Sequence, residues 1–234
     1  MRLILTAHGS VDPRSVATSH AVADRIRDLR PRLDVRVAFC EKSTPNLREV
    51  LAELDGPAVV TPLLLASAYH ARVDIPSIIA ESGADVDQAE TLGEDLRLVR
   101  VMHQRLAQLG VEQQCSKTGV LVVAVGSSHT AANVRTAAVA GMLARGTGWA
   151  GVQVAHATGS GPSVSDGIDR LRQVGARRIA LAPWFIAPGR ITDRVAASAQ
   201  EAGVAMAEPL GASRLLAATV LDRFDLAVAQ RLAA

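Results

Sequence analysis

Residues 3–10, LILTAHGS, are an apolar run that stops at a histidine and is followed by a Gly-Ser turn. Residues 120–127, VLVVAVGS, repeat this pattern, with Val125 at the place of His8. Each run has the length and composition of a buried strand, and each glycine marks a turn. Because the same strand and turn occur twice, the sequence predicts an internal duplication.

The surrounding segments alternate in the same way in both halves. Short β-branched runs, typical of strands, cover 2–7, 34–40, 57–65 and 84–90, and again 119–125, 151–156, 177–184 and 203–207. Amphipathic stretches, typical of helices, cover 13–30, 45–54, 73–82 and 95–109, and again 130–145, 163–174, 190–201 and 212–231. Asp12-Pro13 and Thr44-Pro45 each place a capping side chain before a proline, which predicts a helix start.

This alternation predicts an α/β fold in which helices cover both faces of parallel sheets. The segment 110–118, GVEQQCSKT, is polar and unpatterned, and we interpret it as a linker. The expected lobes are therefore 1–112 and 118–234, two similar units that face each other across a cleft.

The composition argues against several classes of protein. The formal net charge of the 234 residues is only +2, and 3% of them are aromatic, which disfavours nucleic-acid binding. No apolar stretch has the length of a membrane span, and the first residues do not resemble a signal peptide. Cys40 and Cys115 make no disulfide framework. We expect a cytoplasmic protein with no membrane partner.

Three polar residues of the first half fall near the predicted strand ends. His8 closes the first strand, Glu41 follows the second, and His70 lies past the third. Ligands of open α/β sheets bind at the carboxyl ends of the strands, where two imidazoles and a carboxylate can converge. Such a set suits an open site for a divalent transition metal, and the same imidazoles could accept protons. Each residue alone could instead be structural.

The second half serves as an internal comparison. Val125 and Thr158 align with His8 and Glu41, and a gap beside Arg190 and Ile191 aligns with His70. A role in shaping the fold would be needed in both copies, so the difference favours a chemical function that is needed once.

Three segments together resemble the sirohydrochlorin chelatase family. They are AHGSVDPR from residue 7, VAFCEKSTPNL from residue 37, and PLLLASAYHARVDIP from residue 62. The resemblance covers the whole chain as a fused, two-lobe form, although these motifs lie in the first lobe. It implies two flavodoxin-like lobes with parallel sheets, of the class II chelatase type. The family inserts cobalt or iron into sirohydrochlorin, in cobalamin or sirohaem synthesis.

Carried onto this sequence, the resemblance implies that His8 and His70 are metal ligands and proton acceptors and that Glu41 assists them. Cys40 stands where the family usually has leucine. The metal, Fe²⁺ or Co²⁺, is a substrate, and no permanently bound cofactor is expected. The partner is a small-molecule tetrapyrrole, and the fused lobes are compatible with a monomer.

Sirohydrochlorin carries eight carboxylates, for which arginine is the natural partner. Candidate substrate-binding residues near the strand ends are Ser10, Arg14, Arg72, Arg135, Arg190 and Arg194. His129 and His156 lie at strand ends of the second lobe and could also touch the substrate. Trp184 and Phe185 are expected in the core.

Two other functions are compatible with parts of the sequence. A metal or tetrapyrrole carrier could use the same two lobes without catalysis. The histidine phosphatases also end a strand with His-Gly, but they place an arginine where this chain has Ala7, and no duplication is expected there.

Overall fold

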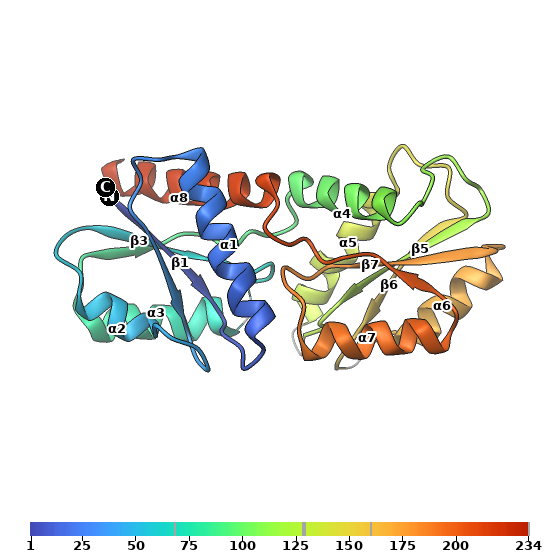
Figure 1. Cartoon of the computed structure of the whole chain (residues 1–234), viewed down its shortest axis with the longest axis horizontal. Helices are drawn as coiled ribbons and strands as arrows, with labels where there is room; N and C mark the ends of the chain where they lie inside the picture. The colour runs from blue at the N-terminus through green and yellow to red at the C-terminus, as the bar shows by residue number, and fades with distance from the viewer. Residues whose placement is uncertain (68, 128–129, 160, 234) are drawn as a thin grey trace. The chain divides into compact units, whose positions relative to one another are not determined.

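The computed structural model describes residues 1–67, 69–127, 130–159 and 161–233. The chain forms two compact units. The first unit contains Met1–Asp95 together with Ala212–Ala234, and the second contains Leu96–Gly211 (Figure 1). Each unit has one four-stranded parallel sheet, so the predicted α/β class with a repeated parallel sheet is confirmed.

The sheet of the first unit has the strand order β2-β1-β3-β4. Its strands are β1 (Arg2–Ala7), β2 (Val35–Phe39), β3 (Ala58–Pro62) and β4 (Val86–Gln88). Its helices are α1 (Pro13–Leu29), α2 (Leu47–Ala52), the π-helical turn η1 (His70–Asp74), α3 (Ile75–Ser82) and α8 (Arg214–Ala233). α2 and α3 pack together on one face of the sheet, and α1 and α8 pack together on the other.

The second unit repeats this plan with the order β6-β5-β7-β8. Its strands are β5 (Thr118–Ala124), β6 (Gly151–His156), β7 (Arg178–Pro183) and β8 (Ala205–Met206). Its helices are α4 (Leu96–Gln108), α5 (Thr130–Ala144), α6 (Val164–Gln173) and α7 (Arg190–Glu201). The central strands β1 and β5 are mostly apolar, and all of their residues except Arg2 are buried, because helices cover both of their faces.

Each sheet is completed by a helix from the other sequence repeat. α4 follows the first sheet in the chain but packs against α5 and β7, and α8 follows the second sheet but packs against α1, β3 and β4. Figure 1 shows α8 alongside α1, although the two helices are far apart in the sequence. The predicted lobes 1–112 and 118–234 describe the repeat, whereas the compact units exchange one helix each.

Of the two predicted helix starts, one is confirmed and one is wrong. Asp12 is the N-cap of α1, its side chain accepts from the backbone N–H of Arg14, and Pro13 opens the helix. α2 does not begin at Pro45, which follows a cis peptide bond. It begins after Asn46, whose side chain forms a capping box with Glu49. Pro45 instead accepts a backbone hydrogen bond from Phe39 at 3.0 Å and so belongs to the edge of the sheet.

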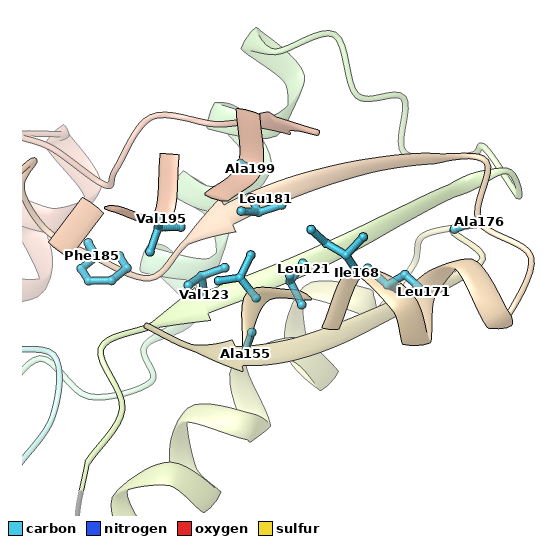
Figure 2. Close-up of a cluster of buried hydrophobic side chains, with 11 residues drawn as sticks. Leu121, Val123, Ala155, Ile168, Leu171, Ala176, Leu181, Phe185, Val195 and Ala199 are labelled. Carbon is cyan, nitrogen blue, oxygen red and sulfur yellow. The ribbon is translucent and has the colours of Figure 1, made fainter. Parts of the chain in front are cut away.

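Figure 2 shows the core between α6, α7 and the sheet of the second unit. Leu121 and Leu181 from the strands meet Ile168 and Leu171 from α6, and all four side chains are almost completely buried. Phe185 belongs to this core and Trp184 is also buried, at 8% and 4% exposed respectively, as the sequence predicts. None of the described helices is long and apolar enough to span a membrane.

The packing of α8 on the first sheet generates a stability prediction. Leu216 is 0% exposed and Leu232, in the same helix, is 80% exposed. We expect Leu216→Ala to lower the free energy of unfolding by about 3 kcal/mol, since it leaves a cavity under the sheet. Leu232→Ala should change it by less than about 0.5 kcal/mol. Denaturant unfolding measures both, and equal effects would contradict the described packing.

Candidate active site at the strand ends of the first unit

Backbone pairing beyond the end of β1 brings His8 and Glu41 together. Cys40 N–H donates to the carbonyl of Ala7, and Glu41 N–H donates to the carbonyl of His8, both at 3.0 Å. Gly9 follows with φ +93°, and a Cβ at this position would lie 1.7 Å from the carbonyl oxygen of Glu41. Only glycine fits both the conformation and the close approach. The His-Gly pair therefore fixes the two strand ends side by side.

The side chains of His8, Glu41 and His70 meet at this point. The Nε2 of His8 lies 3.2 Å from Oε1 of Glu41. The imidazole rings of His8 and His70 have centroids 4.1 Å apart and are tilted by 47°. All three side chains are between 35% and 43% exposed, so a ligand can reach them.

His70 reaches the site from a helical turn and not from the end of a strand. β3 ends at Pro62 and not at residue 65, and His70 is the first residue of η1 rather than a strand-end residue. Its Nδ1 contacts Oδ2 of Asp74, four residues later in the same turn. A carboxylate at Nδ1 fixes the ring orientation and leaves Nε2 for a ligand or a proton.

Asp74 is not among the site residues that we predict from the sequence. The signal that could have found it is the spacing in HARVD, which places His70 and Asp74 on the same side of a helical turn.

The charges of this site follow from burial and from Lys42. Burial, followed by the neighbouring His70, lowers the pKa of His8, whose Nδ1 is buried and has no hydrogen-bond partner among the described residues. A hydrogen bond from Lys42, whose Nζ lies 2.6 Å from Oε1, lowers the pKa of Glu41. At neutral pH, His8 is therefore neutral and Glu41 is ionised. Burial raises the pKa of Cys40 to about 11, so this thiol stays protonated.

The three side chains do not form a finished metal cage. Within the described ranges, no group of three or more His, Cys, Asp or Glu side chains is arranged to hold a metal ion. His70 directs Nδ1 to Asp74, and Glu41 is held by Lys42. The arrangement offers two imidazoles with a carboxylate beside one of them. Such a pair can take a cation or a proton temporarily, with coordination positions left for a second ligand.

The second unit has the same backbone arrangement without these side chains. Thr158 N–H donates to the carbonyl of Val125 at 2.8 Å, and Gly126 has φ +89° with its hypothetical Cβ 2.2 Å from the Thr158 carbonyl oxygen. Val125 is 42% exposed at the place of His8. The aligned positions are therefore structurally equivalent, and only the first copy carries the imidazole and the carboxylate.

Two of the proposed substrate-binding residues have structural partners. The hydroxyl of Ser10 accepts from Asp12 N–H at 3.0 Å, which shapes the turn before α1. The guanidinium of Arg14 binds both carboxylate oxygens of Asp12, at 3.0 and 2.6 Å. A substrate carboxylate would have to compete with Asp12 for Arg14.

The other proposed arginines are exposed. Arg72 lies in η1 of the first unit, Arg135 lies in α5, and Arg190 and Arg194 lie in the first turns of α7. Each keeps its proposed role as a prediction. His129 lies outside the described residues, and His156 ends β6.

Comparison with known proteins gives the same family for both repeats. The family model described as CbiX matches residues 2–109 and 119–227. A sirohydrochlorin cobaltochelatase of Priestia megaterium is 22% identical over 204 residues, which cover 82% of this chain and 66% of the relative. A sirohydrochlorin ferrochelatase of the same organism is 23% identical, over 82% of this chain and 76% of the relative.

A solved structure has the same fold. SirB from Bacillus subtilis with Fe³⁺ matches with a TM-score of 0.85 and 18% identity, over 100% of this chain and 98% of that chain.

The fold and the site thus define a duplicated parallel α/β protein with a histidine pair on one copy. The family match extends over nearly the whole chain. The chain belongs to the CbiX family.

The charges around His8 predict that two substitutions shift its pKa in opposite directions. The charge of Glu41 raises the pKa of His8, and the charge of Lys42 lowers it, while burial makes the largest contribution. Glu41→Gln should therefore lower the pKa of His8 further, and Lys42→Gln should raise it. NMR titration of the imidazole measures both variants. A shift in the same direction for both would contradict the described geometry.

Proposed function

We propose that this protein is a sirohydrochlorin chelatase, which inserts Fe²⁺ or Co²⁺ into sirohydrochlorin and releases two protons. The observation that carries the proposal is the ring contact of the neutral His8 with His70, beside the ionised Glu41. Membership of the CbiX family supports it, as do the relatives named as a cobaltochelatase and a ferrochelatase.

The metal side of the reaction needs ligands that hold a cation briefly. Neutral imidazole nitrogens suit both Fe²⁺ and Co²⁺, and an adjacent carboxylate offsets part of the positive charge. Two imidazoles without a third fixed ligand leave coordination positions for the tetrapyrrole nitrogens. Transfer to the macrocycle can then proceed by ligand exchange. The metal is a substrate in this scheme, and the residues require no permanently bound cofactor.

The proton side of the reaction needs two acceptors. Metallation replaces two pyrrole N–H bonds with metal–nitrogen bonds, so two protons must leave the ring. Neutral His8 accepts a proton at Nε2 in the tautomer that carries its hydrogen on Nδ1, and Nε2 of His70 is available because Asp74 occupies Nδ1, each nitrogen once the metal has left it. Glu41 contacts Nε2 of His8 and can pass a proton on to solvent. Each proton therefore has an accepting atom in the site.

Substitution of the histidines tests the proposal. His8→Ala and His70→Ala should each lower turnover by at least about 10²-fold, because each removes a ligand and a proton acceptor. The matched control is His20→Ala, since His20 is exposed on α1 and should leave turnover unchanged. The assay is anaerobic, follows the visible spectrum of sirohydrochlorin with Co²⁺ or Fe²⁺, and runs for many turnovers.

The same assay separates the enzyme from a carrier. A spectral change that stops at one equivalent of protein would support a carrier, and unchanged rates in both histidine variants would refute the assigned site. The rates with the two metals also compare them as substrates, since the ligand types alone do not select between Fe²⁺ and Co²⁺.

Asp74 generates a separate prediction as a positioning residue. Asp74→Asn should lower turnover by about 10- to 100-fold, since the amide no longer fixes the tautomer of His70. The pH–rate profile should shift as well, because the charge of Asp74 raises the pKa of His8 and the amide removes this effect. Asp74→Glu should restore part of the rate. A variant with normal turnover and an unchanged pH profile would show that Asp74 only caps the turn.

A further inference from the structure

The second unit contains a separate pocket on the face covered by α6 and α7. Its volume is about 530 Å³. Val164 and Ile168 of α6 and Val195 of α7 form its apolar floor, which continues into the core shown in Figure 2. Its polar lining consists of His156, Ser163, Ser165, Arg194, Ser198 and Glu201.

His156 has unsatisfied hydrogen-bonding groups in this pocket. Both ring nitrogens are buried, and neither has a partner among the described residues. A Cβ on Gly161 would lie 2.2 Å from Nδ1, so the backbone at Gly161 is packed closely against the ring. Burial lowers the pKa of His156, which is therefore a neutral ring with one N–H donor and one acceptor. Unpaired buried polar atoms are costly, so the ring favours a hydrogen-bond partner that none of the described residues supplies.

The equivalent position in the first unit shows that the fold does not need an imidazole here. Phe39 N–H donates to the carbonyl of Pro45, and His156 N–H donates to the carbonyl of Pro162, so the two residues are structural equivalents. Phe39 is 1% exposed and lies in the interior. A purely structural role at this position is therefore met by an apolar ring.

Arg194 supplies a cation to the same pocket. Among the residues that the structure describes, no carboxylate lies within ion-pair distance of its guanidinium, although Glu201 also lines the pocket. By contrast, Arg172 of the neighbouring helix pairs with Asp169 at 3.2 Å. The pocket is thus lined by an arginine and an imidazole that both lack a partner among the described residues.

The amino terminus of α6 does not add to this site. Asp166 N–H donates to the hydroxyl of Ser163 at 3.2 Å, and Ser163 N–H donates to Asp166 at 2.9 Å, so the helix is already capped. The negative charge of Asp166 at this end disfavours a doubly charged ligand such as phosphate. A single arginine and a neutral imidazole suit a single negative charge with two acceptor oxygens.

We propose that this pocket of the second unit binds a carboxylate group, with the guanidinium of Arg194 and a ring N–H of His156 as donors. The carboxylate has two possible sources. One is a side-chain carboxylate of the tetrapyrrole, which rests on the proposed function, and the other is a free small carboxylic acid. The chemistry at Arg194 and His156 is the same for both.

NMR titration of the full-length protein tests the proposal. The imidazole ¹⁵N resonances of His156, assigned by their loss in His156→Phe, should shift on addition of propionate. Arg194→Gln should raise the apparent dissociation constant for propionate by about 10-fold, as expected for loss of a charge-assisted pair. The matched control is Arg170→Gln, which removes the same charge from α6 outside the pocket and should leave the constant unchanged.

Titration with metal-free sirohydrochlorin distinguishes the two sources. A shift of the His156 resonances at much lower concentration than with propionate assigns the carboxylate to the tetrapyrrole. A shift with propionate alone assigns the pocket to a free acid. If the His156 resonances shift with neither ligand, the proposal is overturned, even if the protein is an active chelatase. Conversely, carboxylate binding by a protein with no chelatase turnover would overturn only the proposed function.

His156→Phe provides a second readout that does not depend on activity. The variant copies the residue of the first unit, so it should fold and should raise the Tm without ligand, because it removes two unpaired polar atoms. Propionate should stabilise the natural protein and leave the variant unchanged. A variant that keeps the full stabilisation by propionate would overturn the proposal.

Discussion

The close approach of β1 and β2 beyond their last paired residues is the constraint on which the candidate site depends. The hydrogen bond from Glu41 N–H to the His8 carbonyl and the glycine at position 9 allow the two backbones to meet without a side chain between them. The imidazole and the carboxylate are thereby placed by backbone geometry, which a parallel sheet covered on both faces keeps rigid. Side chains held in place in this way lose little entropy when they bind a ligand.

The chemistry that this arrangement favours depends on a neutral imidazole, His8, beside an ionised carboxylate, Glu41. Partial burial and the second imidazole keep His8 neutral, while Lys42 keeps Glu41 ionised. A neutral ring is both a metal ligand and a proton acceptor, and an ionised carboxylate favours the approach of a cation. Within the described part of the chain no third ligand converges on the two imidazoles, which suits temporary binding of a cation better than storage.

The duplicated fold carries the imidazole and the carboxylate at the strand ends of one copy only. Gly126 and the bond from Thr158 N–H to the Val125 carbonyl preserve the same strand-end geometry in the second unit. Among the described residues of this unit, the buried side-chain atoms without a hydrogen-bond partner belong to His156, which lines a pocket together with Arg194. Duplication has therefore kept the packing of the sheet, while the polar residues of the two copies have diverged.

The sequence by itself determined the α/β class, the repeat and most of the strands, because apolar runs and helical periodicity record which faces are buried. It also singled out His8, whose place at the end of an apolar run is a local property. Tertiary structure decided which sheet each helix covers, since the apolar faces of α4 and α8 fit either sheet in the sequence pattern. It also decided how His70 reaches the site, because the contact with Asp74 depends on a π-helical turn that local propensity does not specify. The sequence also could not predict that the ring nitrogens of His156 are buried without a partner among the described residues. Burial of a polar atom depends on contacts between distant segments.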